Sequence, residues 1–143
     1  MAWLFGGGRN NKNKKLKEEV KRIDEDIEEL FKEFRDPVAV LHHPNNMEKA
    51  INLIKRILKD VEQYKKSLTS YSHNLYHFPE INQLENSIKE FLKKLEEIYT
   101  WIFKLHRTTV LDPIIQEIKT ELHKISDFWN IHKNKLHRLG IIK

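Results

Sequence analysis

The stretch EINQLENSIKEFLKKLEEIYTWIFKLH, residues 80–106, decides the fold, because its apolar residues recur at alternating steps of three and four. That spacing places one apolar stripe on one face of a helix. The stripe consists of Ile81, Leu84, Ile88, Phe91, Leu95, Ile98, Ile102 and Leu105. A heptad pattern sustained over more than three repeats predicts a long helix that packs against other helices.

Three further segments, residues 14–35, 46–69 and 113–139, show the same periodicity. The first ends at Asp36-Pro37, because the residue before a proline avoids the helical region. Gly140 is the expected stop of the last segment. Their stripes are Leu16, Val20, Ile23, Ile27, Leu30 and Phe34; Met47, Ile51, Ile54, Leu58, Val61, Tyr64 and Leu68; and Ile115, Ile118, Leu122, Ile125, Trp129, His132, Leu136 and Leu139.

Four such helices with short connections predict an all-α protein, an antiparallel four-helix bundle in up-down-up-down order. We expect this bundle domain to span residues 14–143, preceded by residues 1–13 as an apolar tip, a glycine hinge and a basic leader. An extended coiled coil is the structural alternative. The connections 36–44 and 69–79 each leave room for an extra helical turn.

Composition excludes several classes of function. The chain has 143 residues and no cysteine, which excludes disulfides, thiol nucleophiles and cysteine-ligated metals. Its first apolar run, residues 1–5, is shorter than a secretory or membrane-spanning segment, so we expect a cytoplasmic protein, with peripheral attachment to a membrane as an option. No glycine-rich phosphate loop and no nucleophile elbow is present, so a non-enzymatic role is expected.

Positive charge is concentrated near both ends of the chain. Residues 1–22 hold seven bases and two acids, and residues 128–143 hold four bases and no acid. In an up-down-up-down bundle both segments lie at one end of the molecule, together with the aromatic connection 71–78. Basic residues interleaved with aromatic ones are typical of contact with anionic lipid or with RNA.

Two groups of residues follow as candidates for contact. Membrane or partner contact is expected of Trp3, Leu4, Phe5, Lys12, Lys14, Lys15 and Lys17. Phosphate or aromatic contact is expected of Tyr71, Tyr76, Phe78, Lys133, Lys135 and Arg138. An apolar tip followed by a polybasic stretch is a two-signal arrangement for reversible membrane attachment.

The first eight residues, MAWLFGGG, resemble the short apolar N-terminus that precedes the basic helix of ESCRT-III membrane-remodelling proteins. The resemblance implies a tip that enters lipid. It covers only these residues, since that family has a much longer first hairpin and an acidic C-terminal region that this chain lacks. The alternative is that Trp3, Leu4 and Phe5 pack on the bundle or on a partner chain.

Histidine is the remaining candidate for site chemistry. His73 and His77 are four residues apart, and His132 occupies a stripe position and should point inward, so the three together could hold zinc or iron. A His-x-x-x-His pair on a helical bundle is similar to haemerythrin-like proteins, but the Glu-x-x-His pairs of di-iron bundles are absent.

The sequence therefore predicts a binding or scaffold protein. Its basic, aromatic end would engage an anionic membrane surface or a larger protein assembly. RNA or ribonucleoprotein binding is the first alternative and a histidine-based metal-binding bundle is the second. A second copy of the chain is a further possible partner.

Overall fold

The computed structural model describes residues 2–72, 78–106 and 110–142, with side chains described for residues 14–70, 78–106 and 110–142. Within these ranges the protein is all-helical, with 90% of residues in helices and five α-helices, four of them long. The elements in chain order are α1 (Ala2–Glu33), α2 (Pro37–His42), α3 (Pro44–Ser72), α4 (Pro79–Tyr99), the π-helical segment η2 (Thr100–Lys104) and α5 (Leu111–Arg138).

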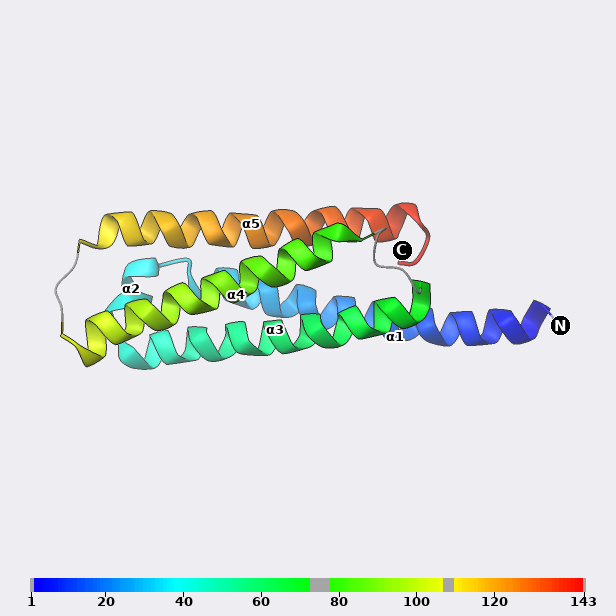
Figure 1. Ribbon diagram of the computed structural model, residues 1–143, viewed down its shortest axis with the longest axis horizontal. Coiled ribbons are helices and arrows are strands. Elements are labelled where there is room, and N and C mark those ends of the chain that lie inside the picture. Colours follow the sequence, from blue (N-terminus) through cyan, green and yellow to red (C-terminus); the bar gives the residue numbers. More distant parts are fainter. Residues whose placement is uncertain (1, 73–77, 107–109, 143) are drawn as a thin grey trace.

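The four long helices lie along a common long axis (Figure 1). Helix α3 packs against both α1 and α4, and α4 packs against α5, while the short α2 contacts α3 and α5. The start of α1, the end of α3, the start of α4 and the end of α5 lie at one end of the molecule, which we call the basic end. At that end the first part of α1 projects beyond the other helices (Figure 1).

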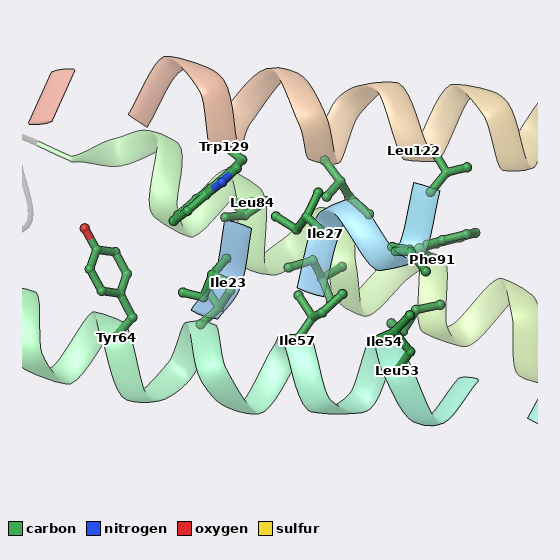
Figure 2. Close-up of a cluster of buried hydrophobic side chains, with 14 of the residues drawn as sticks. Ile23, Ile27, Leu53, Ile54, Ile57, Tyr64, Leu84, Phe91, Leu122 and Trp129 are labelled. Carbon is green, nitrogen blue, oxygen red and sulfur yellow. The ribbon is translucent and has the colours of Figure 1, made fainter. Parts of the chain in front are cut away.

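Most residues of the predicted stripes form the core, but Leu139, the last residue of the 113–139 stripe, is 58% exposed because it follows the end of α5. Figure 2 shows Ile23 and Ile27 from α1 among side chains from α3, α4 and α5. Every stripe residue of the 14–35 segment is buried, and the rings of Phe34 and Phe91 lie 5.5 Å apart. His132 is 0% exposed, so the prediction that it points inward is confirmed.

The structure places the start of the first helix earlier than the sequence predicts. Helix α1 begins at Ala2, not at residue 14, and it includes Gly6, Gly7 and Gly8 without a break. These glycines are therefore helical and do not form a hinge. Glycine costs about 1 kcal/mol in a helix relative to alanine, but extending an existing helix needs no new nucleation, so the packed part of α1 can propagate through them.

The connection between the first two long helices contains an extra helix, as its length allowed. Pro37 opens α2, and the Asp36 Oδ1 accepts a hydrogen bond from the Ala39 backbone N at 3.3 Å. Val40 and Leu41 of α2 are buried in the core. Helix α3 then starts at Pro44, two residues earlier than expected.

The expected regular helix over 80–106 changes to a π-helix in its last turn. The Leu105 backbone N donates to the Thr100 carbonyl at 2.9 Å, a step of five residues. A wider turn rotates the following side chains away from the stripe. Leu105 is consequently 52% exposed, and its neighbour Trp101 is 51% exposed, although the heptad places Leu105 in the core.

Helix α5 stops where the sequence predicts. Gly140 has φ 71°, and its backbone N donates to the His137 carbonyl at 3.1 Å. The Ile141 backbone N donates to the Leu136 carbonyl at 3.0 Å, which completes a Schellman motif. The turn directs Ile141 and Ile142 back into the protein, where both are buried.

Candidate functional site

A hollow of about 420 Å³ lies at the basic end, between α1 and α5. We call it the α1–α5 hollow. Its lining residues are Lys17, Val20, Lys21, Asp24, Lys133, His137 and Ile142. Basic residues from near the start of the chain and from near its end therefore line the same hollow.

Helical periodicity places these side chains. Lys17, Lys21 and Asp24 are spaced by four and three residues, so they share one face of α1, as Lys133 and His137 share one face of α5. Lys17, Lys21 and His137 are exposed. Val20 and Ile142, at 6% and 9% exposure, form an apolar floor beneath them.

Asp24 fixes one wall of the hollow. One of its carboxylate oxygens accepts hydrogen bonds from the Lys133 Nζ at 2.6 Å and from the Trp129 Nε1 at 2.9 Å. Partial burial opposes ionisation of this carboxyl, but these two bonds and the charge of Lys133 outweigh it and hold the pKa of Asp24 below its usual value. Asp24 therefore stays charged and orients Lys133.

A buried polar chain lies next to the hollow and connects α3, α4 and α5. The Tyr64 hydroxyl lies 2.5 Å from the His132 Nε2, and the His132 Nδ1 lies 2.7 Å from the Glu80 Oε1. The Lys135 Nζ donates to the other oxygen of Glu80 at 2.9 Å. Tyr64 and His132 are both 0% exposed.

The protonation of this chain follows from its surroundings. Burial lowers the pKa of His132, although Glu80 opposes this shift, so the imidazole is neutral. Burial opposes ionisation of Glu80, but hydrogen bonds from His132 and Lys135 keep its pKa below the usual value. The His132 Nδ1–H consequently donates to the Glu80 carboxylate, and the Nε2 accepts from the Tyr64 hydroxyl. Tyr64, His132 and Glu80 are buried, whereas the Lys135 side chain at the end of this group is 24% exposed.

The residues expected to contact phosphate or bases have different environments. Lys133 lines the hollow, Lys135 is bonded to Glu80, and Arg138 is exposed in the last turn of α5. Phe78 is 3% exposed, and its ring centroid lies 5.6 Å from that of His132, so it belongs to the core rather than to a contact surface. The side chains of Tyr71 and Tyr76 lie outside the described residues.

The residues expected to contact a membrane all belong to α1. Lys14 and Lys15 are exposed, and Lys17 lies in the hollow. Trp3, Leu4, Phe5 and Lys12 belong to the helical backbone of α1, and their side chains lie outside the described part of the chain. Over the residues that the structure describes, no helix has the length and apolar character needed to cross a bilayer.

The metal hypothesis receives no added support. His73 and His77 lie outside the described residues, and His132 has bonding partners at both ring nitrogens. Within the described ranges, no group of three histidine or carboxylate side chains is arranged to hold a metal ion. Zinc or iron binding at the three histidines stays a prediction.

Sequence reasoning missed five residues of the hollow, namely Lys21, Asp24, His137 and the two floor residues Val20 and Ile142. The i,i+4 spacing of Lys17 with Lys21, and of Lys133 with His137, was visible in the sequence. The sequence does not show that these two pairs lie opposite each other, because this depends on how α5 packs relative to α1.

Comparisons of the chain with family models, with curated proteins and with solved structures found no match. Arguments about its function therefore start from the geometry of the basic end.

Proposed function

We propose that this protein is a non-enzymatic binding or scaffold protein that attaches to an anionic membrane surface through its basic end. The observation that carries the proposal is the α1–α5 hollow, where Lys17 and Lys21 face Lys133 and His137. We further propose that α1, α3, α4 and α5 form the antiparallel up-down-up-down bundle that presents this end.

Electrostatics supplies the first part of the attachment. Lys14, Lys15, Lys17 and Lys21 are exposed along α1. Each basic residue close to an anionic lipid surface contributes about 1 kcal/mol. Because these charges stand on one helix and next to those of α5, they can approach the same patch of headgroups.

The projecting start of α1 supplies the second part. It carries Trp3, Leu4 and Phe5 in sequence and extends beyond the other helices (Figure 1). Tryptophan and phenylalanine are favourable at the depth of lipid headgroups, and one apolar element combined with a polybasic patch gives reversible attachment. The bundle then serves as the platform that holds both elements on one side.

Burial of Phe78 favours lipid over RNA as the partner. Sequence-tolerant binding of single-stranded RNA needs aromatic faces on which bases stack. Phe78 is not such a face, because it packs against His132 and the Lys135 Nζ lies 5.6 Å from its ring centroid. Its burial removes Phe78 from the predicted stacking surface, whereas lysines next to an apolar tip are a combination that suits lipid.

The proposal is tested by co-sedimentation of the full chain with anionic and with zwitterionic liposomes. The test variant is Lys17→Glu with Lys21→Glu, which reverses two charges of the hollow. The matched control is Lys55→Glu with Lys59→Glu, since these lysines are also exposed and four residues apart, but lie on α3 away from the hollow.

We expect the wild-type chain and the control variant to sediment with anionic liposomes, and the test variant to stay in the supernatant. Absence of wild-type binding would refute membrane attachment. An equal loss in both variants would show that net charge, rather than the basic end, causes the binding. Retained binding to a single-stranded RNA by a Trp3→Ser, Leu4→Ser, Phe5→Ser variant that has lost liposome binding would separate the two partners.

A further inference from the structure

We infer that the α1–α5 hollow is a headgroup site for a lipid phosphomonoester, so that attachment depends on which anionic lipid the membrane contains. This inference rests on the proposed function, because it names the ligand of the same basic end. A phosphomonoester is a terminal phosphate group, which differs from the phosphodiester present in every phospholipid.

The charge of the hollow matches such a group. Three ammonium groups line it, and Asp24 offsets one of them through its bond to Lys133 at 2.6 Å. Lys17 and Lys21, for which the described side chains provide no ion pair, add two positive charges beside His137. A phosphomonoester carries between one and a half and two negative charges near pH 7. A phosphodiester carries one, and would leave the hollow positively charged.

The arrangement of donors also fits a terminal phosphate. Lys17 and Lys21 are one helical turn apart on α1, and Lys133 and His137 are one turn apart on α5, so donors stand on two sides of the space between them. A terminal phosphate has three oxygens that accept hydrogen bonds in different directions. A donor on each wall can therefore bond to a different oxygen.

Part of the hollow is ordered before any ligand arrives. The Lys133 side chain is 27% exposed, and Asp24 holds its ammonium group, while Trp129 holds Asp24 from the core. Fixing a donor in advance reduces the entropy lost when a ligand binds. The exposed Lys17 and Lys21 would then close on the phosphate from the α1 side.

The size and floor of the hollow fit a lipid rather than a bare ion. Its volume of about 420 Å³ is larger than a phosphate group needs, and lies within the range of small-molecule sites. Val20 and Ile142 provide apolar surface at its base. The glycerol carbons next to a terminal phosphate would cover that surface.

The experiment measures binding of the full chain to two kinds of vesicle with the same zeta potential. One contains phosphatidic acid, whose phosphate is a monoester, and the other contains phosphatidylserine. We compare the wild type with two double variants. The test variant combines Lys17→Gln with Lys21→Gln, and the control variant combines Lys14→Gln with Lys15→Gln. The control removes two charges from the same helix, but neither residue lines the hollow.

We expect the wild type to bind phosphatidic acid vesicles about tenfold more tightly than phosphatidylserine vesicles, which corresponds to about one headgroup bond beyond surface attraction. The control variant should bind both kinds of vesicle more weakly but keep the ratio between their affinities. The Lys17→Gln, Lys21→Gln variant should lose the ratio.

A wild-type ratio near one, or a ratio that the two variants change equally, would overturn the headgroup site while leaving membrane attachment intact. Absence of binding to either vesicle would instead refute the proposed function and the headgroup site with it. Soluble glycerol phosphate is added as a competitor. Soluble glycerol phosphate that binds as tightly as phosphatidic acid vesicles, compared per phosphate group, would show that the free phosphate, and not the membrane lipid, is the ligand.

Discussion

Removing the hydroxyl of Tyr64 should weaken the fold more than its size indicates. In Tyr64→Phe the aromatic ring stays in the core, but the His132 Nε2 loses the donor that lies 2.5 Å away. Because both residues are 0% exposed, no water replaces that donor. The imidazole is left with an unsatisfied acceptor in the interior.

The expected loss is about 2 kcal/mol of unfolding free energy, since a buried polar atom without a partner costs about 1–3 kcal/mol. For a chain of this length each kilocalorie corresponds to about 2–4 °C, so the melting temperature should fall by about 4–8 °C. The matched control is Tyr99→Phe. The Tyr99 hydroxyl donates to the exposed Glu48 at 2.6 Å, where water can take its place, so little change is expected.

The assay is urea unfolding of both variants and the wild type, followed by far-UV circular dichroism at pH 7.5, with a thermal melt alongside. The two substitutions remove the same group from the same residue type, so their difference isolates burial. Equal midpoints for Tyr64→Phe and the wild type would refute the reasoning. Equal losses in both variants would show that the loss does not arise from the His132 chain.

Three further predictions concern single side chains. Burial and, to a lesser extent, the nearby Asp26 raise the pKa of Asp60 to about 6. Between about pH 4 and 6 the folded state therefore keeps a proton that the unfolded state has released, and the free energy of unfolding falls as the pH rises through this range. Asp60→Asn should therefore raise the free energy of unfolding by about 1 kcal/mol at pH 7.5, after allowance for solvent screening, and by almost nothing at pH 4. Urea unfolding at both pH values measures this difference, and an equal gain at both would contradict the prediction. Asp24→Asn removes the negative charge from the α1–α5 hollow and should strengthen binding to anionic vesicles about fivefold; weaker or unchanged binding would count against the role of the hollow. Gly140→Ala should lower the free energy of unfolding by about 1 kcal/mol, because the φ of Gly140 is +71°, where a side chain strains the backbone. A Cβ at this position meets nothing within 4 Å, so backbone strain is the cause, and an unchanged midpoint in urea unfolding would contradict it.

The positions of the long helices could be predicted from the sequence, because the apolar stripes repeat regularly and each one must be covered. His132 is the clearest case, since its stripe position predicts burial and the structure buries it completely. Helix ends were less predictable. The heptad continues through Thr100 to Leu105, and no residue there signals that the backbone widens into a π-helix.

The candidate site could be predicted only in part. The two basic segments are visible in the sequence, and their meeting at one end follows from chain direction. Which cations face each other depends on the rotation of α5 against α1, which periodicity does not fix. The partners of His132 were also out of reach, because Tyr64 and Glu80 lie 68 and 52 residues away in the chain.

The central claim is that the basic end faces an anionic membrane while the opposite end does not. Because the chain has no cysteine, a single cysteine can carry a fluorescent label at one chosen place. Asn134→Cys places the label at an exposed position near the basic end of α5, and Gln116→Cys places it at an exposed position near the start of the same helix.

The measurement is quenching of each label by a quencher attached to the headgroups of anionic vesicles. The account predicts strong quenching at position 134 and little at position 116. Equal quenching at both positions, or quenching at position 116 alone, would contradict it.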